Sequence, residues 1–417
     1  MIFRKFCISQ RPYPWVITVS MILGFLLAPV IFSNIKNISN AFISRVDRKT
    51  TPEPLYGFLQ PFSYNSAFWD MSFALDFAGV YYRAKNFDRG DIYTNRNYDI
   101  LGRPLLYSPI ICYLYSKTFC KLPYSTAVLF HIFFQCILLL IATYLVLRYY
   151  KLELLIIPFI LIYSILLFLT PVGLSWFERG QFEIYPALAI LFFMFAVQES
   201  KGYAFVISAI FASLKWTLAP FFIQAFVIYF FLSRDKDKIK FCLMFAAVIV
   251  LTLVFFPYYL KDYLTILTQA QSFSAEGISL VSRMPSYVIS LIPLITLGVY
   301  LIPLCLNYKR IKSHNTFLPY MTSLVTINML LPSITYEYRI VCLIGFLPMT
   351  IPWVIKYKED RLFQIEFISL LTIFMFVAFH GFWMISESFP PMEYMISAYF
   401  AFYLAISTIC IPRLMPN

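Results

Sequence analysis

Long apolar runs recur along most of the chain, and only short polar segments separate them. The runs are about 15 to 24 residues long, which is the length an α-helix needs to cross the hydrocarbon core of a bilayer. Lipid cannot hydrogen-bond an open strand edge, and the alternating pattern of barrel strands is absent. Charged residues make up only 13% of the 417 residues, against about 25% in soluble domains. The sequence therefore predicts an all-α polytopic membrane protein.

We expect about twelve transmembrane helices, one for each apolar run. They lie near residues 15–33, 124–147, 152–174, 182–198, 203–215, 217–232, 241–259, 287–306, 317–333, 339–355, 364–385 and 394–411. The segment 203–232 is too long for one helix, and both of its flanks are basic, so we expect two short helices that turn at "KWTLAP". No small-x-small cleavage site follows the first run, which is therefore expected to remain as a helix.

The basic residues set the expected orientation. The net charge is +12, but Lys and Arg form short clusters between apolar runs rather than one stripe, which argues against nucleic-acid binding. Roughly 17 of them fall in short loops on the side of the N-terminus and about five in short loops on the other side. The positive-inside rule then predicts cytoplasmic termini. We expect a multi-pass protein whose one long polar loop faces outward, to the periplasm of a bacterial inner membrane or to a topologically equivalent space.

The chain is interpreted as a single domain, residues 1–417. Residues 34–123 form the first extracytoplasmic loop and residues 124–417 the transmembrane bundle. Within the loop, the run 105–119 is short and contains Pro109. A full crossing there would invert every later loop and break the charge asymmetry, so this run is expected to be re-entrant or interfacial.

The stretch "DFAGVYYRAKNFDRGDIY", residues 76–93, is polar and aromatic although it belongs to a largely apolar chain. At helical spacing it has an apolar stripe, consisting of Phe73, Phe77, Val80 and Ala84, as is typical of helices that lie along a membrane surface. A neighbouring stripe contains Asp76, Gly79 and Arg83. We therefore expect an amphipathic helix that holds one carboxylate at headgroup depth. Asp70 lies on another face of the same helix.

Several short motifs follow one another in a defined order. They are Asp76, the pair Tyr81-Tyr82, Ala84, Gly90, Tyr93, "YSP" at 107–109, Gly180-Gln181, Lys215 with Pro220, and Pro332 with Tyr336 and Tyr338. This order resembles that of glycosyltransferase family 87, whose members belong to the GT-C superfamily and use polyprenol-phosphate sugars. Two positions depart from the family pattern, since Ser108 replaces a proline and Phe182-Glu183 follows Gly-Gln where the family often has Asn.

The resemblance implies a GT-C-like helix bundle and an inverting transfer of a hexose, glucose or mannose, from a polyprenyl phosphate to an extracytoplasmic glycan or glycolipid. Modification of O-antigen or lipopolysaccharide is one such reaction. Asp76 is the implied general base, because the acceptor hydroxyl must lose a proton as it attacks the activated anomeric carbon. The residues expected to bind the two substrates are Tyr81, Tyr82, Arg83, Tyr107, Gln181, Glu183, Lys215, Tyr336, Tyr338 and Arg339.

Structural roles are the alternatives for several of these residues. Lys215 also fits a lysine that extends from a helix end toward the headgroups, and Arg339 also fits an internal ion pair. Outer-loop aromatics, among them Trp176, could stack on sugar rings but more often form an interfacial belt. For the whole protein, the alternative to an enzyme is a transporter or flippase of a lipid-linked sugar, although such proteins place ionisable groups at mid-membrane.

No metal or other cofactor is expected. The eight cysteines lie almost all in apolar runs without CxxC spacing, and the three histidines fall on different segments. The outer loops lack the Asp-x-Asp motif with which nucleotide-sugar enzymes hold a divalent ion. Asp88 and Asp91 lie three apart and are the alternative metal ligands.

Overall fold

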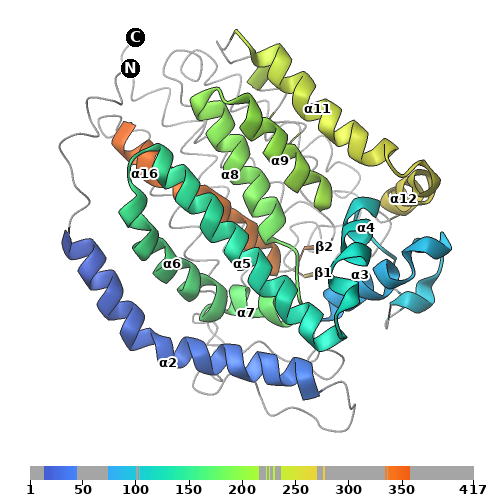
Figure 1. The fold of residues 1–417 in the computed structure, drawn as a ribbon, viewed down its shortest axis with the longest axis horizontal. Coiled ribbons are helices and arrows are strands. Elements are labelled where there is room, and N and C mark those ends of the chain that lie inside the picture. The colour runs from blue at the N-terminus through green and yellow to red at the C-terminus, as the bar shows by residue number, and fades with distance from the viewer. Residues whose placement is uncertain are drawn as a thin grey trace, which may run out of the picture.

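The computed structural model describes residues 14–44, 74–99, 102, 104–215, 222, 225, 229–230, 236–269, 276–277, 334–335 and 337–356. The described chain is helical apart from one pair of two-residue strands (Figure 1). The α-helices are α2 (Pro14–Ser44), α3 (Leu75–Lys85), α4 (Pro109–Lys117), α5 (Tyr124–Tyr149), α6 (Ile156–Phe168), α7 (Pro171–Glu178), α8 (Ile184–Glu199), α9 (Gly202–Leu214), α11 (Lys238–Val254), α12 (Pro257–Gln269) and α16 (Leu347–Lys356).

The shorter elements connect these helices. The 3-10 helices are η3 (Phe87–Arg89), η4 (Arg96–Tyr98), η5 (Phe119–Lys121), η6 (Glu153–Leu155) and η10 (Glu337–Phe346). The strands β1 (Glu276–Gly277) and β2 (Ile334–Thr335) pair in parallel, with Glu276 opposite Ile334. Their pairing joins two segments that are far apart in the sequence.

Two of the described helices are long and apolar enough to cross a membrane by themselves, α2 and α5. Two bent pairs bring the number to four if each pair forms one span: η6 and α6 with α7, bent by 72°, and α11 with α12, bent by 99°. The helices expected near 124–147, 182–198 and 203–215 are present as α5, α8 and α9. The runs 287–306, 317–333, 364–385 and 394–411 lie outside the described residues, as does most of 217–232.

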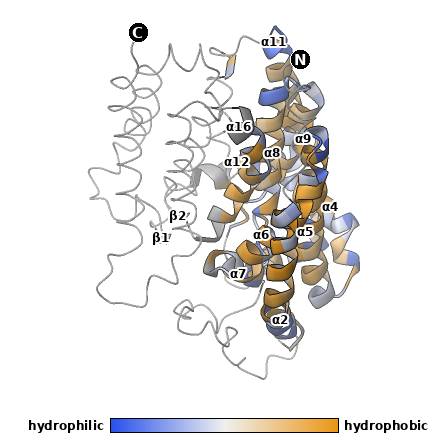
Figure 2. Ribbon diagram, turned by 90° about the vertical axis from the view of Figure 1, so that its left-hand side faces the viewer, coloured by the Kyte–Doolittle hydropathy of each residue, from blue (hydrophilic) through white to orange (hydrophobic). Residues whose placement is uncertain are grey.

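Apolar residues run along most of α5, α8 and α9 (Figure 2). On α5 they divide into two faces. Phe130, Ile137, Ile141 and Leu145 are exposed, whereas Ile132, Leu139 and Val146 are buried. Exposed apolar side chains at helical spacing are typical of the face of a membrane helix that meets lipid. The opposite face of α5 packs on the interior.

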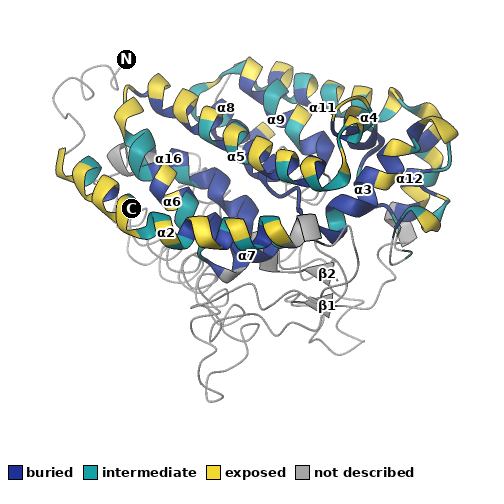
Figure 3. Ribbon diagram, turned by 60° about the horizontal axis from the view of Figure 1, so that its bottom comes forward, coloured by how far each residue is buried: buried dark blue, intermediate teal, exposed yellow. Residues whose placement is uncertain are grey.

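α8 lies at the centre of the described bundle, where nearly all its residues are buried (Figure 3). It packs against α9 on one side and η10 on another. Gly345 of η10 permits this second contact, since a Cβ atom there would lie 2.1 Å from the carbonyl oxygen of Ala187. A helix that is hydrophobic all round is stable in such a central position.

The expected amphipathic helix is present as α3, but protein covers its apolar stripe. Phe77 and Val80 are fully buried and Ala84 is 1% exposed, and α3 packs against α4 and η5. Phe73 lies outside the described residues. The expectation that lipid covers this stripe was wrong, because helical periodicity shows which side chains share a face but not what covers them.

Residues 105–119 contain α4, which has nine residues. A helix of that length spans about 13 Å, less than half of the hydrocarbon core. Pro109 is its first residue, where the missing N–H costs no helical hydrogen bond. Most of α4 packs within the protein, and its contacts with α3 and η5 join the outer loop to the start of α5.

Candidate active site

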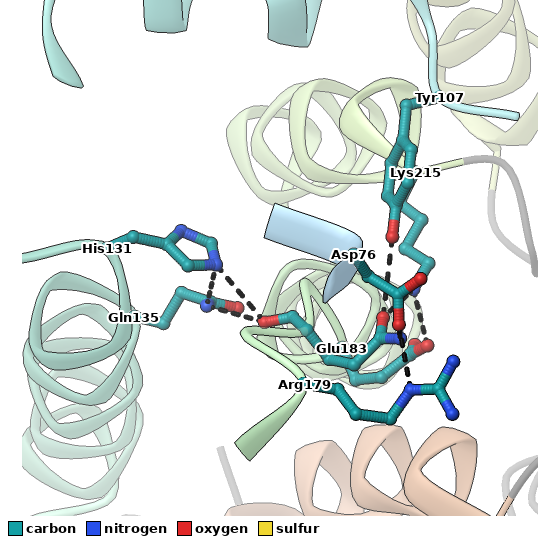
Figure 4. A network of polar contacts seen from close by, with 8 residues as sticks. Asp76, Tyr107, His131, Gln135, Arg179, Glu183 and Lys215 are labelled. Atoms are coloured by element: carbon teal, nitrogen blue, oxygen red, sulfur yellow. Dashed lines mark hydrogen bonds and ion pairs between the residues drawn. The ribbon is translucent and has the colours of Figure 1, made fainter. Parts of the chain in front are cut away.

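Asp76 stands in the first turn of α3 and is only 12% exposed. Two side chains from the segment after α7 hold the same carboxylate oxygen. Arg179 donates from Nε to Oδ2 across 2.8 Å, and Gln181 donates to Oδ2 from its side-chain amide (Figure 4). Hydrogen bonds to an ionised carboxylate stabilise the charged form. Two donors from one segment thus hold the Asp76 carboxylate.

The backbone aligns the two segments. The N–H of Ala74 donates to the carbonyl of Glu178 at 2.6 Å, and the N–H of Asp76 donates to the carbonyl of Arg179 at 3.2 Å. The turn after Arg179 needs glycine, because Gly180 has φ of 61° and a Cβ there would lie 2.8 Å from Cβ of Phe77. A larger residue would push α3 away from the turn.

Gln181 connects this carboxylate with a lysine at the end of α9. Its Oε1 accepts hydrogen bonds from Lys215 Nζ at 3.1 Å and from Tyr107 Oη at 3.4 Å. Lys215 Nζ also lies 5.3 Å from the centre of the Tyr107 ring. With its Nε2 on Asp76 and its Oε1 on Lys215, the Gln181 amide fixes the distance between an anion and a cation (Figure 4).

Lys215 forms a buried ion pair with Glu183. Its Nζ lies 2.5 Å from Glu183 Oε1, and the two side chains are 7% and 1% exposed. A second contact brings Tyr107 to this end of α9, because Ser108 donates from Oγ to the carbonyl of Ser213 at 2.6 Å. The charges of Asp76, Glu183, Arg179 and Lys215 balance within the described site.

Three predicted binding residues lie elsewhere. Arg83 is buried and donates to the carbonyls of Ile92 and Gly79, and it lies 3.7 Å from Asp99. These contacts connect α3 to the loop that follows it. Tyr81 is buried and donates to the carbonyl of Leu122, and burial raises the pKa of its hydroxyl. Tyr82 is 37% exposed and stacks on Tyr124, with an interplanar angle of 8°.

The remaining predicted binding residues fall on or beside η10, which packs against α7. Tyr338 and Arg339 belong to this element, and Tyr336 precedes it. Tyr336 and the side chains of Tyr338 and Arg339 lie outside the described part of the structure. Of the outer-loop aromatics, Tyr93 and Trp176 are buried by protein.

Of the two aspartates considered as metal ligands, Asp91 is held by its neighbours. Asp91 accepts hydrogen bonds from Asn95 at 3.0 Å and from Tyr98 at 2.9 Å. The bond from Asn95 and that from Tyr98 hold the pKa of the Asp91 carboxyl below its usual value. Among the described residues, no group of three His, Cys, Asp or Glu side chains is arranged to hold a metal ion.

Three residues of the site were missed by the sequence analysis. Arg179, His131 and Gln135 were given no function there. The last two are fully buried on α5 and bond near the Gly180-Gln181 turn. A signal was available, because a histidine and a glutamine four residues apart share one face of an apolar span.

Comparison with known proteins places residues 106–333 within a family. They match the model of glycosyltransferase family 87. Searches of curated proteins and of solved structures gave no match. The matched segment includes Tyr107, Gln181, Glu183 and Lys215, while Asp76 precedes it.

Proposed function

Because the chain belongs to glycosyltransferase family 87, and is therefore a membrane glycosyltransferase with a sugar donor and an acceptor, we propose that it transfers a hexose from a polyprenyl phosphate. The hexose is glucose or mannose, and the acceptor is a glycan or glycolipid outside the membrane. The observation that carries this proposal is the Asp76 carboxylate, which is little exposed, held by Arg179 and Gln181, and adjacent to the buried Lys215–Glu183 pair.

In the proposed reaction Asp76 is the general base. An acceptor hydroxyl loses its proton to Asp76 while its oxygen attacks the anomeric carbon of the donor. A glycosidic C–O bond forms, and the bond from the anomeric carbon to the phosphate oxygen breaks with inversion. The bonding electrons leave with the polyprenyl phosphate, whose negative charge rises by one. No nucleotide or metal takes part in these steps.

Arg179 is suited to a second role in the same step. Before the reaction its positive charge faces ionised Asp76 at 2.8 Å. When Asp76 takes the proton it becomes neutral. Its carboxyl then no longer balances the positive charge of the Arg179 guanidinium. At that moment the leaving phosphate gains charge. We therefore propose Arg179 as a cation for the phosphate, together with Lys215 and Arg339, since guanidinium groups match phosphate oxygens in geometry.

Tyr107, Gln181, Glu183 and Lys215 are proposed to bind the two substrates. Glu183 is a candidate acceptor for a sugar hydroxyl, once Lys215 turns from it toward phosphate. Tyr82, which is partly exposed beside Tyr124, is a candidate for stacking on a sugar ring. Tyr81, Arg83, Tyr336, Tyr338 and Arg339 complete the proposed set. The site is proposed to face the periplasm from a bacterial inner membrane, where O-antigen or lipopolysaccharide is an acceptor.

Purified protein in detergent or nanodiscs tests this function. It is incubated with polyprenyl-phosphate glucose or mannose, in which the hexose is radiolabelled, and with a lipopolysaccharide fraction as the acceptor. Release of polyprenyl phosphate that depends on the acceptor, and a product of inverted anomeric configuration, are expected. Movement of the lipid-linked sugar across a liposome membrane without release of phosphate would instead identify a flippase.

A further inference from the structure

The backbone carbonyl of Gln181 is bound from the side of a membrane-spanning helix. Gln135 on α5 donates from Nε2 to this oxygen across 2.9 Å, and His131 Nε2 lies 3.3 Å from it (Figure 4). His131 and Gln135 are themselves 2.9 Å apart and are fully buried. His131 is the eighth residue of α5, about 10 Å along the helix from its first residue. Placing polar side chains at this depth in a membrane costs free energy, so residues that occupy such positions usually have a structural or functional role.

We assign the donor from the hydrogen-bond distances. Gln135 Nε2 carries two hydrogens and lies 2.9 Å from both the Gln181 carbonyl and His131 Nε2. If it donates to both, His131 Nε2 is an acceptor, and the imidazole proton is on Nδ1. A flipped Gln135 amide would instead place its oxygen against the carbonyl oxygen of Gln181. The first arrangement is therefore the one that satisfies the three atoms.

The other side of His131 fits the same arrangement. Its Nδ1 lies 2.6 Å from Tyr115 Oη, which lies 2.9 Å from Tyr185 Oη. The Nδ1 proton is donated to Tyr115, and Tyr115 then donates to Tyr185. His131 is thus neutral and oriented by α4 and α8, and it presents its free lone pair to Gln135. Aromatic rings complete the enclosure, with the centre of Phe182 4.4 Å from that of His131.

We propose that His131 and Gln135 are positioning residues for the transfer reaction. They act through the carbonyl of Gln181: by fixing the backbone at this residue they set where its side-chain amide stands between Asp76 and Lys215. Neither residue touches the proposed reacting atoms. This inference rests on the proposed function for its catalytic consequence, but the tether itself is a property of the folded chain.

Gln135→Met tests the tether, because methionine fills a similar volume and has no N–H to donate. We expect kcat to fall by about 10- to 100-fold with little change in KM, as when a reacting group is slightly misplaced. Thr143→Val is the matched control. Thr143 is also buried on α5 and hydrogen-bonds Tyr163 at 2.8 Å, away from Gln181. It should lower the melting temperature without changing kcat.

A second pair of variants separates the two sides of the imidazole. In His131→Gln the side-chain amide oxygen reaches the position of Nε2 and preserves an acceptor for Gln135, so kcat should be largely retained. In His131→Asn the amide reaches only the position of Nδ1, so kcat should fall as in Gln135→Met. Equal activities of these two variants, both of them folded, would overturn the proposal.

Hydrogen exchange of the peptide that covers residues 176–183 gives a measurement independent of catalysis. The N–H groups of Gly180 and Gln181 bond the carbonyls of Phe177 and Trp176. Their exchange should be faster in Gln135→Met than in wild type or Thr143→Val. Unchanged exchange would overturn the tether. If wild-type protein transfers no sugar, the proposed function fails while this comparison still decides the tether.

Discussion

The guanidinium Nε of Arg179 lies 2.8 Å from Oδ2 of Asp76, although 103 residues separate the two in the sequence. Both side chains are mostly buried, at 14% and 12% exposed. Backbone hydrogen bonds from Ala74 and Asp76 to the end of α7 hold the two segments in register. The pair therefore forms because α3 packs on the turn at Gly180. This packing places a carboxylate and a guanidinium side by side.

Asp76→Asn should lower the transfer rate by about 100-fold or more, because asparagine is nearly isosteric but cannot accept the proton. Turnover and thermal unfolding are measured together, so that a loss of rate is separated from a loss of stability. Asp91→Asn is the matched control, since Asp91 lies in the same outer loop and is bound by Asn95 and Tyr98. A fully active Asp76→Asn protein would remove Asp76 from the mechanism.

Arg179→Gln should lower kcat by about 10- to 100-fold, because a cation that stabilises developing charge is lost. Asp76 would also lose the neighbour that favours its ionised form, so its pKa rises. The base is active when ionised, and the acid limb of the kcat/KM profile therefore moves to higher pH. Arg179→Lys should recover part of the activity. A profile that stays in place would contradict the role of Arg179 beside Asp76.

Lys215→Met should destabilise the protein by about 3–5 kcal/mol, because Glu183 is left buried without its cation. Glu183→Gln should destabilise it for the converse reason. The double variant is expected to be more stable than either single one and still inactive. Thermal or denaturant unfolding in detergent measures the coupling. Additive losses of stability would show that the pair does not interact.

The orientation is checked with single cysteines and an impermeant thiol reagent on intact cells. Asn97→Cys lies at an exposed position in the outer loop and should react from outside. Lys236→Cys, in the basic cluster before α11, should react only after the membrane is opened. The unmodified protein gives the background from its own cysteines. Labelling of Lys236→Cys in intact cells would invert the proposed topology.

Transfer should be unchanged when a chelator removes divalent metals, because the proposed leaving group is a lipid monophosphate that basic side chains can bind directly. The assay compares purified protein with and without chelator, then with added magnesium or manganese. The double variant Asp88→Asn/Asp91→Asn is assayed under the same conditions. Activity that disappears with chelator, returns with metal and is absent in that double variant would assign those carboxylates as ligands.

Much of the local structure was predictable. Apolar length predicted α5, α8 and α9, and Pro109 interrupted the run that became the short helix α4. The order of the motifs predicted the family. Both Gln181 and Lys215 were predicted as site residues, and the structure brings them within 3.1 Å of each other. Arg83 was predicted from its stripe on the helix, yet it bonds the loop after α3, because a stripe does not show which partner lies opposite.

The sequence by itself determined the membrane class, the positions of several helices and the motif residues, because these depend on local composition and periodicity. Tertiary structure alone decided that Arg179 faces Asp76 and that Gln135, oriented by His131, holds the carbonyl of Gln181. These contacts join segments about 50 to 100 residues apart, as set by the packing of α3, α5 and α7. A local sequence pattern shows the period of a helix, whereas the packing of the whole chain determines which residues meet across a contact.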